Sequence, residues 1–264
     1  KEYRRQRQMC IRDRFSGLGW SVAGVYSAIV LATGPTVVTP LVRQIRLASP
    51  LSDVLEAEGL ILEPIGAVLA LLLLELVVGD LHGWRELLLG LLSRLGGGVL
   101  IGSLAGLILS EGLKRLRSEP FIGIRLQLTL GVIFLLYGVC EWLLPESGLP
   151  ASVAAGFVVG QRPSTQANEL DKLIRELAQL AITMLFPLLA ADVSWGELSP
   201  LGWGGITCVL FLMVIVRPIA VSIATYGLPL ENKQRLFLGW LAPRGIVTAA
   251  VASLFSIRLE PVSY

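Results

Sequence analysis

Two glutamates and one arginine occur inside stretches that are otherwise apolar enough for a membrane. Glu58 and Glu63 lie in EAEGLILEPIGAVLALLLLE, and Arg217 lies in ITCVLFLMVIVRPIAVSIATYG. An ionisable side chain within a membrane helix costs roughly 2.5–3.5 kcal/mol to insert, so it usually faces a partner or an aqueous cavity. We expect Arg217 to neutralise Glu58 through a bidentate ion pair. Glu63 would then be a deep carboxylate without a fixed cation.

A carboxylate in that position must hold either a proton or a bound cation, because an isolated charge is costly away from water. Oxygen ligands from a carboxylate, hydroxyl groups and carbonyl groups suit a hard cation. Competition of the proton and the cation for Glu63 would couple their movements. The simpler alternatives are that Glu58 caps a helix at the membrane interface and that Glu63 snorkels toward water.

The preceding apolar segment is interrupted in LATGPTVVTPLVRQIRL, residues 31–47. Pro35 lacks an N–H group and disrupts the preceding turn, while Gly34 permits unusual backbone angles. The break would expose carbonyl groups beside the hydroxyls of Thr33 and Thr36, and secondary transporters build ion sites from such interruptions. A proline kink repaired by neighbouring helices is the alternative.

Small residues surround Glu63 on the helix that the sequence predicts for it. The residues that share its stripe by three–four spacing are Gly59, Gly66, Ala67 and Ala70. Small side chains let another backbone approach closely. We expect that backbone to be the Thr33–Thr36 break, so that Glu63, Thr33, Thr36 and Gly34 together bind the ion or the proton.

Composition and length indicate a polytopic membrane protein that is entirely α-helical. Hydrophobic residues make up 54% of the 264 residues and charged residues 16%, whereas soluble domains carry about 25% charged residues. Lysine and arginine concentrate in every second loop, which is the positive-inside pattern and places Arg43 in the cytoplasm. About eight segments are predicted in the lipid bilayer, at 18–43 (interrupted), 56–79, 87–110, 121–141, 148–160, 177–195, 200–226 and 236–257.

The two ends are expected to lie outside the fold. Residues 1–14, KEYRRQRQMCIRDR, look like translated adapter sequence and place basic residues on the side where the positive-inside pattern forbids them. Without their six basic and two acidic residues the net charge falls from +2 to −2, which argues against a nucleic-acid partner. Residues 259–264 follow an apolar segment directly and are expected to be a truncated end. The transmembrane core is therefore assigned to residues 15–258.

Four motifs resemble the bacterial monovalent cation:proton antiporters of the sodium/hydrogen exchanger superfamily. They are TGPTVVTPLVR, EGLILEPIGA, RPIAVSIATYG and GWLAPRGIVTAAV. The resemblance implies an inverted-repeat sodium/proton antiporter fold with crossed discontinuous helices, here incomplete at both ends. It also implies a multi-pass protein of the bacterial inner membrane, a homodimer when full length, with Na⁺ or K⁺ and H⁺ as substrates and no cofactor.

By position, the resemblance gives individual residues a role. Glu63 matches the ion- and proton-binding carboxylate, which holds Na⁺ or K⁺ transiently, and Thr33 lies in the unwound helix where it can lend an oxygen. Glu58 and Arg217 match a paired acid and arginine. Arg244, in APRG, matches an arginine linked with activity or pH response.

The chain departs from the family pattern at two positions. Gly34 stands where the unwound motif commonly has Asp, and Leu62-Glu63 replaces the usual Asn-Asp or Asp-Asp pair. A glutamate reaches about one methylene further than an aspartate, so the site geometry differs. One acid rather than two favours electroneutral exchange.

An inverted repeat also predicts a second interruption in the other half of the chain. Pro187, in ITMLFPLLAADVSWGEL, is the position that we assign to a second unwound helix, and a lipid-facing kink is the alternative. The glycines of LGGGVLIGSLAGLIL are better explained by close helix packing than by a phosphate-binding loop.

These features predict a secondary active transporter that exchanges a monovalent cation for H⁺ by alternating access. They do not favour an enzyme, because no histidine lies in any predicted membrane segment to serve a nucleophile as its base. A cation channel-like permease and a non-functional truncated fragment are the alternatives.

Overall fold

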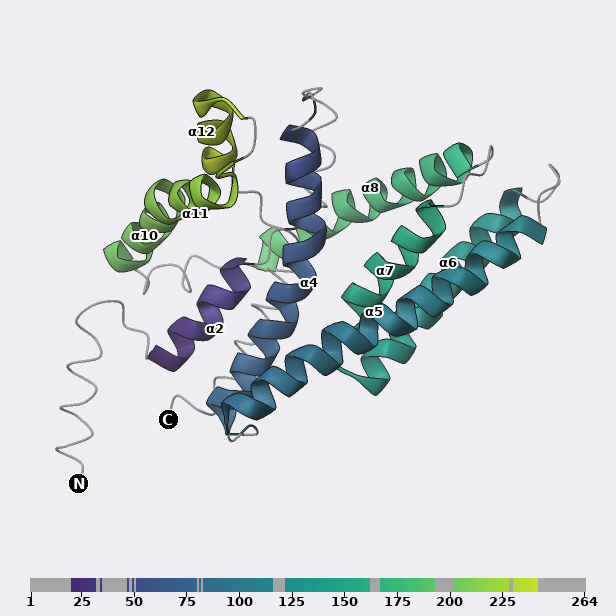
Figure 1. Cartoon of the computed structure of the whole chain (residues 1–264), viewed down its shortest axis with the longest axis horizontal. Coiled ribbons are helices and arrows are strands. Elements are labelled where there is room, and N and C mark those ends of the chain that lie inside the picture. The colour runs from purple at the N-terminus through teal and green to yellow at the C-terminus, as the bar shows by residue number, and fades with distance from the viewer. Residues whose placement is uncertain are drawn as a thin grey trace.

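A computed structural model of the protein describes residues 20–31, 34, 47, 49, 51–79, 81, 83–115, 122–161, 167–192, 202–227 and 230–241. Every regular element in these ranges is a helix, which confirms the all-α prediction (Figure 1). The helices are α2 (Trp20–Leu31), α4 (Leu51–Val78), α5 (Trp84–Arg115), α6 (Ile122–Leu143), α7 (Gly148–Gly160), α8 (Ala167–Asp192), α10 (Gly202–Phe211), the π-helix η3 (Leu212–Val216), α11 (Arg217–Ala224) and α12 (Asn232–Trp240).

Several of these helices match the dimensions of a lipid bilayer. Three are long and apolar enough to cross a membrane, namely Leu51–Val78, Trp84–Arg115 and Gly123–Leu143. Two further apolar helices, Gly148–Gly160 and Val209–Ala224, are shorter. The large hydrophobic side chains on their outer faces are exposed, for example Leu92, Ile108 and Phe134. Such outward-facing apolar side chains suit a lipid environment.

The local sequence sets both ends of α4, the helix that carries Glu58 and Glu63. Asp53 lies in its first turn, where a carboxylate interacts favourably with the helix dipole. Gly79 ends the helix with a φ of +98°, a left-handed conformation that glycine adopts without steric cost. The carbonyl of Glu75 accepts the N–H groups of Gly79 and Leu81 there, at 3.1 and 3.3 Å.

Helix α4 is the central element of the described fold (Figure 1). Its first half contacts α11 and the residues around α12, in the cluster Leu51, Leu55, Val221, Leu230 and Leu238. Its second half packs on one side against α2, in the cluster Val25, Ala28, Ile29, Ala70, Leu71 and Leu74. On another side it packs against α5, in the cluster Val68, Leu72 and Leu87. Because protein packs against α4 on these sides, Glu63 near its middle is buried, whereas Asp53 in its first turn is exposed.

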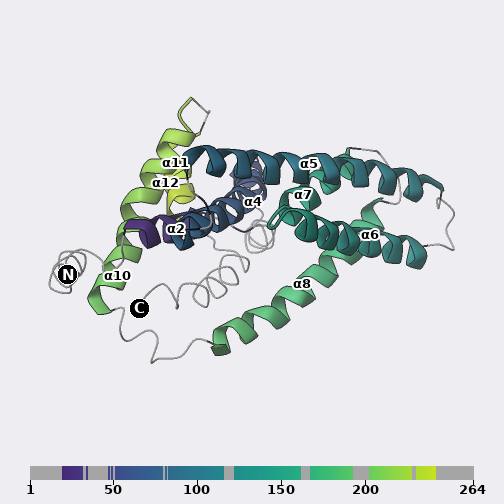
Figure 2. The same ribbon diagram turned by 90° about the horizontal axis from the view of Figure 1, so that it is seen from below.

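Helices α5 and α7 lie against each other along a row of glycines (Figure 2). A Cβ atom added at Gly102 would lie 2.1 Å from the Ala151 carbonyl oxygen, and one at Gly106 would lie 2.8 Å from the Ala155 carbonyl oxygen. The backbones are therefore in direct contact, which requires residues without side chains at these positions. The prediction that these glycines serve helix packing is confirmed.

Helices α10, η3 and α11 follow one another without interruption from Gly202 to Ala224. The N–H of Arg217 donates to the Leu212 carbonyl, five residues earlier, which is the π-helical pattern. Pro218 follows and cannot donate a backbone hydrogen bond. The wide π-helical turn at this point tolerates the proline and sets the direction in which the Arg217 side chain projects from the helix.

The interpretation of Pro187 as a second unwound helix is wrong. Helix α8 runs from Ala167 to Asp192 with Pro187 inside it, and Pro187 is exposed. A single proline removes one backbone hydrogen bond, and the neighbouring turns of this helix continue despite the loss. Helix α8 also begins earlier than the predicted 177, because the charged residues that precede this position are helical too; Lys172 and Glu176 form an exposed pair there.

The segment predicted at 236–257 contains a helix end that the sequence analysis did not place there. Helix α12 ends at Trp240, and Leu241 is extended with φ −77° and ψ 103°. Pro243 follows two residues later, and proline is common just after a helix end because it cannot continue the helix.

We expect Gly102→Ala to destabilise the fold by about 1–3 kcal/mol, because a methyl group would overlap the backbone at Ala151. The melting temperature of the detergent-solubilised protein should fall by several degrees. Gly96→Ala is the matched control, since nothing lies within 4 Å of a Cβ atom at Gly96 in the same helix. An equal effect of both substitutions would contradict direct contact between α5 and α7.

Candidate functional site

Glu63 lies near the middle of α4, and its side chain is buried inside the protein. The residue is only 6% exposed, so the snorkelling alternative does not hold. Its Oε1 atom is buried and has no hydrogen-bond partner among the described residues. A buried carboxylate oxygen in that state is suited to hold a proton or to coordinate a cation.

The small residues that share the helical stripe of Glu63 are buried with it. Gly59, Gly66, Ala67 and Ala70 all lie on the buried face of α4, which confirms the predicted stripe. Pro64 is buried on the next position and cannot donate to the Leu60 carbonyl. The surroundings of Glu63 on its own helix are thus small side chains and one carbonyl released from the helical pattern.

Helix α2 ends close to α4, the helix that carries Glu63. It packs on the second half of α4, and its C-terminal end points toward the middle of that helix (Figure 1). Gly34, three residues beyond its end, is buried. Thr33, Pro35 and Thr36 lie outside the described residues, and so does Arg244.

The structure brings Glu58 and Arg217 together, although they are 159 positions apart in the chain. Arg217 Nη1 donates to Glu58 Oε1, and Arg217 Nη2 donates to Glu58 Oε2 at 3.0 Å. Their side chains are 12% and 19% exposed. Both oxygens of Glu58 therefore have a cationic partner, whereas no ion pair of the described residues involves Glu63, the buried carboxylate of this part of α4.

A second ion pair joins α4 to α5, and the sequence analysis did not identify it. Arg94 Nη2 donates to both carboxylate oxygens of Glu75, at 2.8 and 3.0 Å, and the two side chains are 13% and 20% exposed. Glu75 lies three residues before the end of α4. From the sequence alone, it is explained equally well as an acid at the membrane interface. The signal that could have revealed the pair is Arg94 itself, a basic residue inside an apolar run.

The turn between α6 and α7 holds two further carboxylates close together. Glu141 accepts the N–H groups of Glu146 and Gly148, at 2.9 and 3.4 Å, and so caps the start of α7. Burial raises the pKa of the Glu146 carboxyl above its usual range, the charge of Glu141 raises it further, and Arg94 opposes the shift. Glu146 also has a φ of +64°, an unusual conformation outside glycine.

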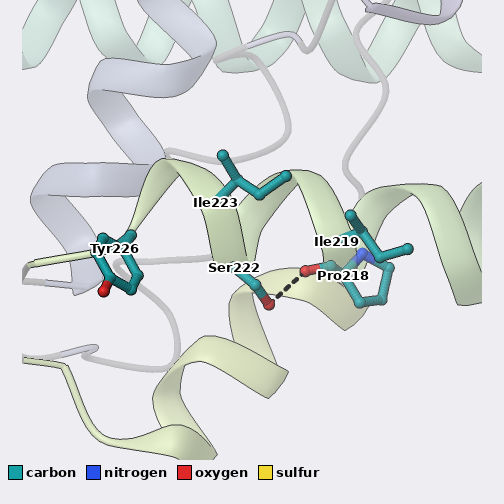
Figure 3. Close-up of a pocket in the computed structure, with 5 residues that line it drawn as sticks. All are labelled: Pro218, Ile219, Ser222, Ile223 and Tyr226. Atoms are coloured by element: carbon teal, nitrogen blue, oxygen red, sulfur yellow. Dashed lines mark hydrogen bonds between the residues drawn. The ribbon is translucent and has the colours of Figure 1, made fainter.

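A pocket of about 470 Å³ lies along α11, far from Glu63 in the sequence (Figure 3). Its lining is Pro218, Ile219, Ser222, Ile223 and Tyr226. The Ser222 hydroxyl donates to the Pro218 carbonyl at 2.6 Å, within the same helix. Among the described residues, the lining is mainly apolar and includes no carboxylate or basic side chain.

These features define a class: integral membrane proteins whose helical core encloses an ionisable site. The comparison with known proteins gives the family. The family model described as "Sodium/hydrogen exchanger, transmembrane" matches residues 11–259. The chain belongs to this family, which places it among membrane transporters rather than enzymes.

Individual relatives agree with the family. The chain is 26% identical over 243 residues to the probable Na⁺/H⁺ antiporter 2 of Methanocaldococcus jannaschii, covering 87% of this chain and 56% of that protein. It is 25% identical over 244 residues to the Na⁺/H⁺ antiporter NhaH of Halobacillus aidingensis, covering 88% of this chain and 59% of that protein. The chain thus spans somewhat over half the length of these relatives.

A solved structure confirms the predicted antiporter fold. The chain superposes on the sodium proton antiporter MjNhaP1 of Methanocaldococcus jannaschii with a TM-score of 0.73. The match covers 90% of this chain and 60% of that chain, at 22% sequence identity.

We expect Glu146→Gln to raise the melting temperature at pH 7.5. The folded protein holds the Glu146 proton more tightly than the unfolded chain does, so ionisation opposes folding once the pH exceeds the ordinary glutamate pKa. Glutamine mimics the protonated acid and removes that cost, and its advantage should shrink as the pH falls toward about 4. Glu111→Gln is the control, because Glu111 is 54% exposed in a surface pair with Lys114. A gain that is the same at both pH values would contradict the raised pKa.

Proposed function

We propose that the protein exchanges a monovalent cation for H⁺ across a membrane, with Glu63 binding the two in turn. The observation that carries this proposal is the buried Glu63 carboxylate, whose Oε1 lacks a hydrogen-bond partner in the described part of the chain. The neighbouring acid, Glu58, is already neutralised by Arg217. Proton and cation would therefore meet at one carboxylate.

Competition at one carboxylate is sufficient to couple the two fluxes. A buried carboxylate is stable when it is protonated or when a cation neutralises it, and it is costly when it is bare. The site can therefore cross between the two sides of the membrane loaded with either ion, while the empty charged form is excluded. Alternating access of that loaded site to the two sides gives exchange.

We assign the remaining ion ligands to the segment that follows α2. Gly34 is buried, and the C-terminal end of α2 points toward the middle of α4. The hydroxyls of Thr33 and Thr36 and the carbonyls beside Pro35 would complete the oxygen shell of the cation. Hydroxyl and carbonyl oxygens are ligands that a hard cation accepts.

The relatives are named as Na⁺/H⁺ antiporters, which supports Na⁺ as the cation. K⁺ has no corresponding support from these names and is the alternative substrate. One exchanging carboxylate supports an electroneutral stoichiometry, because the same charge is neutralised in either loaded state. We retain a homodimer in the bacterial inner membrane as part of the proposal.

We expect Glu63→Gln to abolish cation–proton exchange while the protein remains folded. Uptake of isotopic Na⁺ and Rb⁺ into proteoliposomes with an outward proton gradient is the measurement, and Rb⁺ reports the K⁺ alternative. Glu56→Gln is the matched control, since it makes the same substitution in α4 two turns before Glu63, about 10.5 Å along the helix axis, and should leave uptake close to wild type. Uptake that survives Glu63→Gln would remove the basis of the proposed mechanism.

We also expect exchange to continue when the membrane potential is clamped at zero, at a rate that an imposed potential leaves unchanged. Electroneutral exchange moves no net charge, whereas a channel would carry a current that follows the potential. The measurement is the uptake rate in the same proteoliposomes with valinomycin and defined K⁺ concentrations. A strict requirement for the potential would favour the channel alternative.

A further inference from the structure

Arg217 contacts a third group besides the two oxygens of Glu58. Its Nη2 donates to the main-chain carbonyl of Leu241 at 3.2 Å, in addition to its bond with Glu58 Oε2 at 3.0 Å. Each of the two Nη2 hydrogens therefore has its own acceptor. One acceptor belongs to α4 and the other follows the last residue of α12.

The Leu241 carbonyl needs a donor because α12 ends there. The last four carbonyls of a helix lack intrahelical partners. Leu241 still donates its N–H to the Phe237 carbonyl at 2.9 Å, but its own ψ of 103° turns its carbonyl away from the helix axis. Water is scarce within a membrane protein, so a side chain must satisfy the carbonyl. Arg217 supplies that hydrogen bond with a charged donor, which roughly doubles its strength.

Two features of the sequence place the guanidinium within reach of both acceptors. The π-helix Leu212–Val216 immediately precedes Arg217 and sets the direction of its side chain. Gly239 lets α12 approach α11, since a Cβ atom there would lie 3.0 Å from Pro218 Cα. The surrounding side chains, which include Leu55, Val221 and Leu238, are buried. The contact is thus part of a packed corner between α4, α11 and α12.

We propose that Arg217 is a positioning residue, which fixes the end of α12 relative to the Glu63 site by holding Glu58 and the Leu241 carbonyl with one planar guanidinium. This inference rests on the proposed function of Glu63. Glu58 lies five residues before Glu63, about 7.5 Å along the axis of the same helix. The end of α12 at Leu241 is therefore anchored at a set distance from the exchanging carboxylate, and a change in that anchor alters cation binding as well as stability.

Substitution of Arg217 by lysine distinguishes its contact with Glu58 from its contact with the Leu241 carbonyl. Its ammonium group retains the positive charge that neutralises Glu58, but it lacks the planar fork that serves a carboxylate with two nitrogens and a carbonyl with one of them. Arg217→Lys should therefore keep the ion pair and lose the bond to Leu241. Gly239→Ala should weaken the same bond to Leu241 by another route. The added methyl group pushes α12 away from Pro218 and leaves the Arg217 and Glu58 side chains unchanged.

We expect both variants to raise the apparent KM for Na⁺ about tenfold, the scale of one charge-assisted hydrogen bond. The pH profile of exchange should move in parallel, while the melting temperature changes by only a few degrees. Arg94→Lys is the matched control, since Arg94 binds Glu75 alone through one nitrogen and should tolerate lysine with unchanged KM. A wild-type KM in Arg217→Lys, or an equal shift in Arg94→Lys, would overturn the inference.

Hydrogen–deuterium exchange gives a readout that does not depend on transport. Peptides that cover Leu236–Leu241 should exchange faster in Arg217→Lys and Gly239→Ala than in the wild type, because the end of α12 loses its anchor. If hydrogen–deuterium exchange of these peptides is unchanged in both variants, the inference is overturned, even if the wild-type protein transports cations. If hydrogen–deuterium exchange is faster in the variants but the wild-type protein performs no cation–proton exchange, the anchor is upheld and the proposed function is rejected.

Discussion

The pairing of charge within an apolar environment is the constraint on which this structure depends. Helix α4 carries a buried acid near its middle, Glu63, and a partly buried acid in its first half, Glu58, and their surroundings differ. Glu58 receives a complete bidentate partner from a helix almost 160 residues away, whereas an oxygen of Glu63 has no such partner in the described structure. The same energetic cost of a charge in an apolar environment thus accompanies an ion pair at one position and, in the proposed mechanism, an exchangeable ion site one and a half turns later. The proposed function follows from this asymmetry.

Sequence reasoning succeeded where few solutions to that cost were available. Arg217 is a rare cation inside an apolar run, so pairing it with Glu58 required little more than counting charges. The small residues around Glu63 fall on one helical face by spacing alone, and the structure buries that face. The all-α antiporter fold followed from composition and from motifs that resemble the family.

Sequence reasoning failed where the same pattern permits two structures. Pro187 can break a helix or be accommodated within one, and only the surrounding turns decide; here α8 continues through it. The apolar run at 236–257 hides the end of α12, because the hydrophobicity of a segment does not report where its backbone leaves the helical conformation. The pair of Glu75 with Arg94 was not predicted, because the two residues lie in different helices. Tertiary contacts of this kind leave little local trace.

The contact between α5 and α7 has a consequence for how such a molecule can move. Gly102 and Gly106 place one backbone directly on another, without an intervening layer of side chains that could slide or change rotamer. These two helices must therefore travel as a single piece. The rearrangement that alternating access requires would therefore have to occur at other helix contacts, where side chains separate the backbones and can change rotamer.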